Sequence, residues 1–130
     1  MPTNLMMSSA QVRALHRAGM GVGGHTVSHP ILATLATADV QQEISEGRRH
    51  LQDIVQAPIP LFAYPNGKPG ADYDERAVQA VQEQGFHAAV ATTWGTCHRG
   101  SDPMQLPRFT PWDQTRARFG LRLARQMLRS

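Results

Sequence analysis

The first candidates for chemistry are His25 and His29, which stand four residues apart. Neutral imidazole nitrogens are ligands for zinc and other divalent metals, and two histidines at this spacing can serve one ion. The proline at 30 and the glycines before the first histidine argue against a regular helix. The segment is therefore expected on a loop at the carboxyl end of a strand, where hydroxyl hydrogen bonds from Thr26 and Ser28 would fix the rings.

A bare pair of histidines is more often an ordinary part of a loop than a metal site, so the surroundings decide. Cys97 is the only cysteine, which excludes an internal disulfide and a cysteine-built zinc site. A transition metal in this chain must therefore use histidine and carboxylate ligands.

The elements that must position the histidines alternate between helical and extended patterns. Apolar spacing and stop signals predict helices over about residues 8–19, from about 37 to the proline at 58, over 74–84, and in the arginine-rich C-terminal segment. Short apolar runs between breakers predict strands at 20–24, 61–64, 86–92 and 106–109. This order indicates an α/β architecture with parallel strands.

Repeated β-α units close into barrels or open into doubly wound sheets. A complete (β/α) barrel takes about 200–250 residues, so residues 1–130 are interpreted as a single domain that supplies part of one. A partial barrel leaves strand edges unpaired, and self-association through those edges is a reasonable expectation.

Two motifs together resemble a known family. The segment His-Thr-Val-Ser-His-Pro at 25–30 and the segment Phe-Ala-Tyr-Pro-Asn-Gly at 62–67 are similar to motifs of the NodB-homology polysaccharide deacetylases, carbohydrate esterase family 4. The second motif resembles a branch with Phe-Ala-Tyr-Pro-x-Gly in place of Arg-Pro-Pro-Tyr-Gly. The resemblance covers about residues 11–111 and implies a partial (β/α) barrel of the NodB type without its N-terminal strand or strands.

The resemblance implies a hydrolase that removes N-acetyl (or O-acetyl) groups from a polysaccharide or N-acetylated sugar. A divalent metal, usually zinc, would be held by His25, His29 and an aspartate, and would activate water for attack on the acetyl group. A backbone N–H at Asn66 would bind the developing oxyanion. The turn residues Tyr64 and Pro65 would line the substrate groove with Asn66.

The family's Thr-Phe-Asp-Asp-Gly motif, which gives a metal ligand and the general base, has no counterpart here. The 24 residues before His25 contain no aspartate or glutamate. The late family histidine in a Leu-x-His context is also not evident, and His87 and His98 are weak substitutes. We therefore expect the chain to be the C-terminal portion of a deacetylase domain, poorly active alone, with the aspartates encoded upstream or carried by a partner.

The main alternative is a non-catalytic carbohydrate-binding or structural remnant of the same fold. In that case four aromatic side chains could stack on sugar rings: Tyr64, Tyr73, Trp94 and Trp112. Core packing is, however, the commoner use of such side chains. Trp94 is also assigned to the substrate groove.

The chain has a net charge of +3, and its last acidic residue is Asp113. Five arginines follow, at 116, 118, 122, 125 and 129, and are interpreted as a solvated helix face opposite Phe119, Leu123 and Met127. Nucleic acid is not an expected partner, since no recognition motif accompanies them. No apolar run is long enough to cross a bilayer and no signal peptide is visible, which leaves the compartment open.

Overall fold

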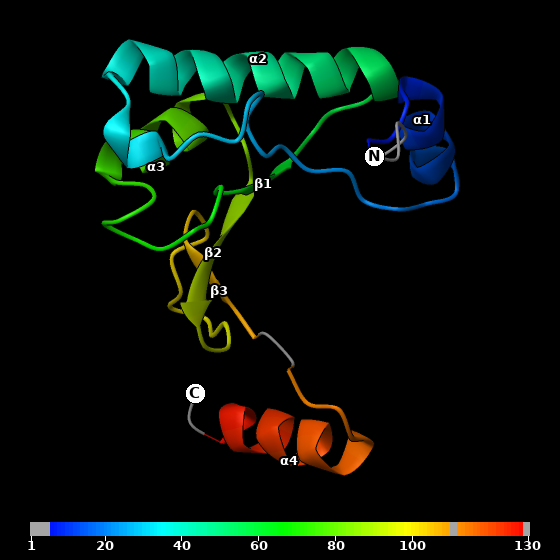
Figure 1. Ribbon diagram of the computed structural model, residues 1–130, viewed down its shortest axis with the longest axis vertical. Coiled ribbons are helices and arrows are strands. Elements are labelled where there is room, and N and C mark those ends of the chain that lie inside the picture. The colour runs from blue at the N-terminus through cyan, green and yellow to red at the C-terminus, as the bar shows by residue number, and fades with distance from the viewer. Residues whose placement is uncertain (1–5, 110–111, 129–130) are drawn as a thin grey trace, which may run out of the picture.

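The computed structural model describes residues 6–109 and 112–128, and the fold is a layer of helices against a small parallel sheet (Figure 1). Its elements, in chain order, are α1 (Ser9–Arg17), the 3-10 turn η1 (Leu32–Thr34), α2 (Thr37–Val55), β1 (Leu61–Ala63), α3 (Glu75–Glu83), β2 (Ala88–Trp94), β3 (Leu106–Arg108) and α4 (Arg116–Met127). The predicted alternation of helices and strands is confirmed.

The three strands form one sheet in the order β1-β2-β3, and both pairs are parallel. Leu61 pairs with Ala88, and Val90 pairs with Leu106. The strand predicted at 20–24 is wrong, because only Gly24 forms a bridge, parallel to Phe62. Glycines at three of those five positions explain the failure, since glycine loses much backbone entropy in a strand and has no side chain to pack.

The predicted helix starts are confirmed by their caps. Ser8 accepts the backbone N–H of Gln11, whose side chain accepts the Ser8 N–H, a reciprocal capping box. The Asp74 carboxylate accepts N–H groups at the first turn of α3. These local bonds supply partners for helix N–H groups that would otherwise lack them.

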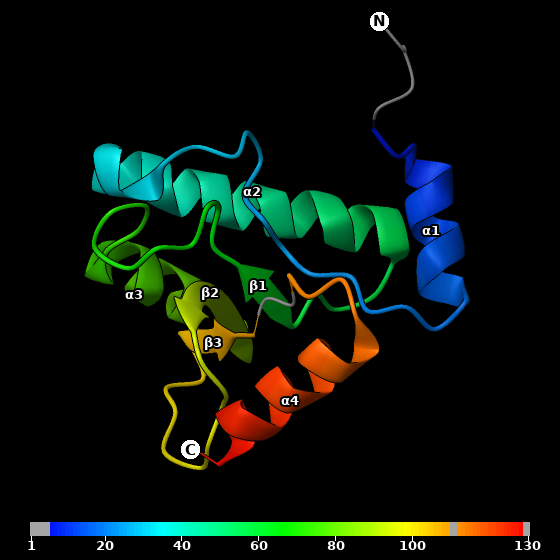
Figure 2. The same cartoon turned by 60° about the horizontal axis from the view of Figure 1, so that its bottom comes forward.

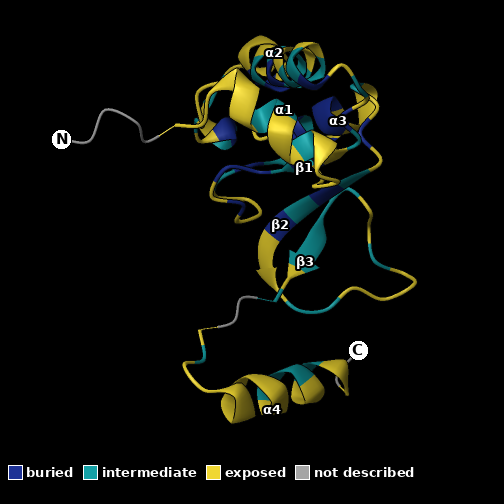
Figure 3. Cartoon of the chain, turned by 90° about the vertical axis from the view of Figure 1, so that its right-hand side faces the viewer, coloured by how far each residue is buried: buried dark blue, intermediate teal, exposed yellow. Residues whose placement is uncertain are grey.

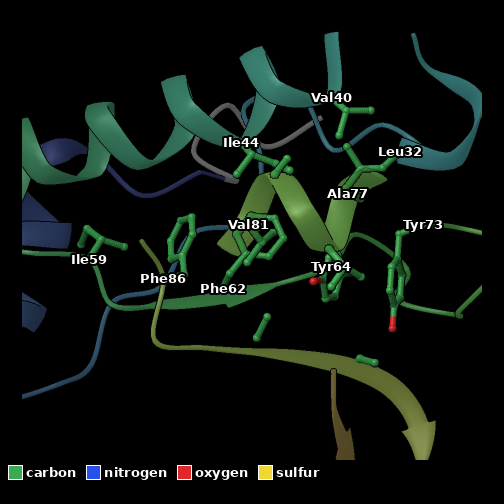
Figure 4. Close-up of a cluster of buried hydrophobic side chains, with 14 of the residues drawn as sticks. Leu32, Val40, Ile44, Ile59, Phe62, Tyr64, Tyr73, Ala77, Val81 and Phe86 are labelled. Atoms are coloured by element: carbon green, nitrogen blue, oxygen red, sulfur yellow. The ribbon is translucent and has the colours of Figure 1, made fainter. Parts of the chain in front are cut away.

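The core lies between α2, α3 and the sheet (Figure 4). Val40 and Ile44 of α2 are fully buried, and Phe62 of β1 packs beneath them against Phe86. Burial of this kind stabilises a fold by about 25 cal/mol per Å² of apolar surface removed from water. The buried positions are concentrated in this layer, whereas α4 is largely exposed (Figure 3).

Helix α4 lies apart from α1, α2 and α3, near the end of β2 (Figures 1 and 2). Its predicted division into an apolar and a solvated face is wrong in part. Met127 of the apolar face is 67% exposed, and Phe119 of that face, at 38%, is about as exposed as the Arg122 side chain of the opposite face, at 40%. Arg122 is partly covered because Asp113 binds its guanidinium at 2.8 Å. The last arginine of the predicted stripe, Arg129, lies outside the described residues. Across residues 6–109 and 112–128, no helix is both long and apolar enough to cross a membrane.

Candidate active site at the carboxyl edge of the sheet

The histidine segment leaves the sheet at Gly24, where the chain meets β1. The Gly24 N–H donates to the Leu61 carbonyl at 2.8 Å, and the Ala63 N–H donates to the Gly24 carbonyl at 2.9 Å. A Cβ at Gly24 would lie 3.1 Å from ring atoms of Phe62 and Phe86, so the approach requires glycine. His25 therefore starts beside the carboxyl end of β1, the edge at which parallel α/β folds place their chemistry.

The ring of His25 is oriented by the backbone of β1. Its Nδ1 lies 2.7 Å from the Ala63 carbonyl oxygen. A carbonyl oxygen can only accept, so Nδ1 donates and the lone pair of the neutral ring is on Nε2. A bond of this kind is the usual outer partner of a metal-binding histidine. The side chain is exposed, so Nε2 is open to a ligand.

His29 is brought next to His25 by two residues with left-handed backbone. Thr26 has φ 66° and His29 has φ 59°. The His29 N–H donates to Thr26 Oγ1 at 3.1 Å, and that hydroxyl donates to the His25 carbonyl. The predicted role of the Thr26 hydroxyl is corrected by these bonds, because it shapes the backbone and does not hold a ring.

The two imidazoles lie at a spacing compatible with binding of one metal ion. Their ring centres are 4.8 Å apart and their planes are inclined at 69°. Two rings bound to one tetrahedral zinc, with Zn–N bonds of about 2.0 Å, would have centres about 5 Å apart. However, nowhere in the described part of the chain do three His, Cys, Asp or Glu side chains gather closely enough to hold a metal. The pair is therefore a candidate for two ligands of a metal site, and no third candidate lies beside it among the described residues.

Glu43 of α2 binds the histidine loop, and sequence reasoning missed it. One carboxylate oxygen accepts the N–H groups of Val27 and Ser28, both at 2.9 Å, and the other accepts the Ser28 hydroxyl at 2.6 Å. Burial alone would raise the pKa of Glu43, but the bonds from Ser28 and Val27 outweigh it and lower the pKa below its usual range. Ser28 therefore binds a carboxylate and no ring.

The second motif forms a tight turn after β1. Asn66 has φ 55° and Gly67 has φ 79°, and the Thr92 N–H donates to the Gly67 carbonyl at 2.8 Å. A Cβ at Gly67 would lie 3.0 Å from the Thr92 backbone, so glycine closes the turn onto β2. Asn66 is left exposed at the carboxyl edge of the sheet, where β1 ends.

Two residues predicted to line the substrate groove are in the core. Tyr64 is 1% exposed, its ring stacks on Tyr73 at 3.8 Å, and its hydroxyl donates to the Met104 carbonyl (Figure 4). Pro65 is fully buried as well. Their side chains cannot reach a polymer, which corrects that prediction. The stacking of Tyr73 on a sugar is excluded for the same reason, since it is 1% exposed.

Trp94 at the end of β2 remains accessible, with 49% of its surface exposed. Its ring contacts Phe109 edge-on, and the Arg122 guanidinium lies 5.7 Å from the ring centre. It borders a cavity of about 550 Å³ whose other lining residues are Asp113, Arg118, Leu121, Arg122, Arg125 and Gln126. Neither histidine of the pair lines this cavity.

The two substitute histidines do not join the pair. His87 precedes β2 and donates its N–H to the Pro60 carbonyl, which places it at the amino edge of the sheet. His25 lies at the opposite edge. His98 belongs to the loop after β2, where its Nδ1 accepts the Gly100 N–H at 3.1 Å. Neither shares a described metal cluster with His25.

Comparisons with known proteins add a family and a fold. A family model described as polysaccharide deacetylase matches residues 2–89. YxkH of Bacillus subtilis strain 168, itself assigned only provisionally to the polysaccharide deacetylases, is 22% identical over 102 residues, which are 78% of this chain and 35% of YxkH. The chain therefore spans about a third of this relative.

Solved structures share the fold at low identity. The Streptococcus pyogenes deacetylase PplD, in complex with acetate, is similar with a TM-score of 0.82 and 19% identity, over 92% of this chain and 51% of PplD. A pseudoenzyme of carbohydrate esterase family 4 from Bacillus anthracis is similar with a TM-score of 0.57 and 17% identity, over 62% of this chain and 27% of that protein. The predicted fold class is thereby confirmed as part of the NodB-type fold.

Proposed function

Because this chain belongs to the polysaccharide deacetylase family, we propose that it contributes the histidine side of a metal-dependent site that removes N-acetyl or O-acetyl groups from a carbohydrate. The observation that supports this most strongly is the His25–His29 pair, whose ring centres are 4.8 Å apart beside the end of β1. The bond from His25 Nδ1 to Ala63 leaves Nε2 free to bind zinc or another divalent metal.

Each residue has a distinct part in the proposed reaction. When bound, a zinc ion would polarise the acetyl carbonyl and promote attack by water. His25 and His29 would hold two of its coordination positions, and the Ala63 carbonyl keeps the His25 ring in one tautomer. The Asn66 backbone N–H, in the exposed turn after β1, is the donor assigned to the developing oxyanion.

Among the described residues, no third metal ligand lies beside the pair. The sequence also contains no Thr-Phe-Asp-Asp-Gly segment, which gives the family its aspartate base. We propose that residues 1–130 form the C-terminal portion of a deacetylase domain and that another segment or a partner chain supplies the aspartates. Loss of a general base lowers a rate by about 10² to 10⁴. The chain alone is therefore expected to release little acetate.

The test is acetate release from N-acetylglucosamine oligomers with added zinc. Turnover near that of intact relatives would refute the expected low activity. A fusion that adds a Thr-Phe-Asp-Asp-Gly segment from a relative should restore release, and His25→Ala in that fusion should abolish it again. Restoration that survives His25→Ala would contradict the assignment of the pair.

A second candidate function is carbohydrate binding without hydrolysis. It is favoured by the half-exposed Trp94, which could stack on a sugar face, and by the incomplete ligand set. A family member from Bacillus anthracis described as a pseudoenzyme is similar in fold. Oligosaccharide binding that is lost in Trp94→Ala, without acetate release from the chain or from the fusion, would favour this function over the first.

We also propose that the chain self-associates through the unpaired edge of its sheet. Within the described sheet, β3 pairs on one side only, with β2. An unpaired edge offers N–H and C=O groups to another strand. Light scattering at increasing concentration tests this, and a monomer throughout the range would contradict it.

A further inference from the structure

The histidine loop adopts a backbone conformation that its own residues do not favour. Thr26 and His29 both have positive φ, at 66° and 59°. Residues with a Cβ rarely adopt this region, and β-branched threonine is especially unfavourable there. The Thr26 hydroxyl supports this conformation from within the loop, because it accepts the His29 N–H and donates to the His25 carbonyl. Contacts from outside the loop add to that support.

A single carboxylate meets the backbone between these two residues. Glu43 Oε2 accepts the N–H groups of Val27 and Ser28, both at 2.9 Å, and Glu43 Oε1 accepts the Ser28 hydroxyl at 2.6 Å. Successive N–H groups that converge on one oxygen form an anion-binding concavity of the backbone. Charge-assisted bonds of this kind are about twice as strong as neutral ones.

The helix that carries Glu43 is itself fixed against the loop. Ile44, the next residue, is fully buried in the core. One turn further along α2, a Cβ at Gly47 would lie 2.9 Å from the carbonyl carbon of Thr26. The loop thus lies against α2 at two points, and Glu43 acts from a rigid support.

We propose that Glu43 is a positioning residue for the histidine pair. Glu43 holds the loop in the conformation that sets the His29 ring beside His25. This role rests on the proposed metal-binding function, because its purpose is to keep the pair ready for an ion. Glu43 is not itself a third ligand: both of its oxygens are bound by the loop, and it belongs to no described metal cluster. Glu43 would affect metal binding indirectly, through its hydrogen bonds to Val27 and Ser28.

The test uses the full chain in three variants. Glu43→Ala removes all three bonds. Glu43→Gln keeps an amide oxygen for both N–H groups and an NH₂ that donates to the Ser28 hydroxyl, so it is the conservative rescue. Glu46→Ala is the matched control, because this second glutamate on α2 is bonded to Gln42 of its own helix.

The first readout is NMR without metal: the amide shifts and the HN–Hα couplings of Thr26 and His29 report whether φ stays positive. Glu43→Ala is expected to lose the positive φ at both residues, Glu43→Gln to keep it, and Glu46→Ala to match the wild type. Positive φ retained in Glu43→Ala would overturn the proposal. This readout stands whether or not the wild type binds zinc.

The second readout is zinc affinity by chelator competition, at a temperature where every variant is folded. Glu43→Ala is expected to bind zinc about 10- to 100-fold more weakly, the usual loss for an outer partner of a metal site, with partial recovery in Glu43→Gln. Unchanged affinity in Glu43→Ala would overturn the role of Glu43. If the wild type binds no zinc at the pair, the metal-binding function fails, and the NMR readout still decides whether Glu43 positions the loop.

Discussion

The histidine loop and the C-terminal arm of residues 112–128 are built in opposite ways. Thr26 of the loop lies against α2, whose Ile44 is fully buried, and the loop is bound by the Glu43 carboxylate. The arm ends in α4, where Leu121 and Met127 are 74% and 67% exposed. Sequence pattern singles out both regions, yet only the first lies against a helix whose side chains are buried in the core.

The difference teaches where precision comes from in this fold. Catalytic and metal-binding groups must be held within fractions of an ångström, which requires a rigid scaffold behind them. The loop has such a scaffold in α2 and β1. In the arm, an ion pair joins Arg122 of α4 to Asp113, but the arginine side chain remains 40% exposed to water, which weakens such a pair. This difference supports the proposal that the chemistry lies in the loop.

The largest expected contrast is in stability. Ile44→Ala should lower the free energy of unfolding by about 2–5 kcal/mol, because it leaves a cavity in a closed core. Leu121→Ala on α4 should change it by less than about 0.5 kcal/mol. Urea unfolding measures both. If Ile44→Ala fails to fold, Ile44→Val should cost about 0.5–1.5 kcal/mol. Equal losses at the two sites would break the comparison.

Alanine substitutions at two helix glycines, one in α2 and one in α4, test the same contrast between the two regions. Alanine in place of a helix glycine usually stabilises by up to about 1 kcal/mol, and Gly120→Ala should do so, since open space surrounds that position. At Gly47 the new Cβ would press on the Thr26 backbone, so Gly47→Ala should destabilise by about 1–3 kcal/mol. Thermal unfolding of both variants decides. Stabilisation by both would mean that α2 and the loop are not in contact.

The smallest expected effect concerns Asp74, the cap of α3. A hydrogen bond from Arg76 lowers its pKa, so its ionic contribution is present above the unfolded pKa of about 3.9 and is lost as the pH falls through the lower, folded pKa. Asp74→Asn keeps the cap and removes the charge. It should cost about 0.2–1 kcal/mol at pH 7, the range for exposed ion pairs.

The measurement is urea unfolding of the wild type and Asp74→Asn over a range of pH. The difference should vanish once Asp74 is protonated in both the folded and unfolded states. A difference that persists there would show that the amide perturbs the cap itself and that the charge is not its cause.

Local features of the fold could be predicted from the sequence because they depend on nearby residues. The caps at Ser8 and Asp74 and the turn at Gly67 each follow from side chains within a few positions. The exposure pattern of α4 could not be predicted, because Arg122 is partly covered by its contacts with Asp113 and the ring of Trp94. A prediction from hydrophobic periodicity assigns arginine to the solvent-facing side, because it takes no account of partners from other segments.

The site shows the same division. His25 and His29 were found from their types and spacing, but the bond from His25 to Ala63 spans 38 residues and has no local signal. Glu43 was missed although it lies beside Ile44, three residues after the buried Val40. A carboxylate at the margin of the buried stripe of a helix was the signal that could have revealed it.

The most direct test of the central claim is a zinc titration followed by NMR of the histidine rings. His25 and His29 should shift together and saturate at one equivalent, while His16, His50, His87 and His98 serve as internal controls. The His29 response should disappear in His25→Ala. Equal shifts at all the histidines, or an unchanged His29 response in the variant, would contradict the claim that the two rings bind one ion.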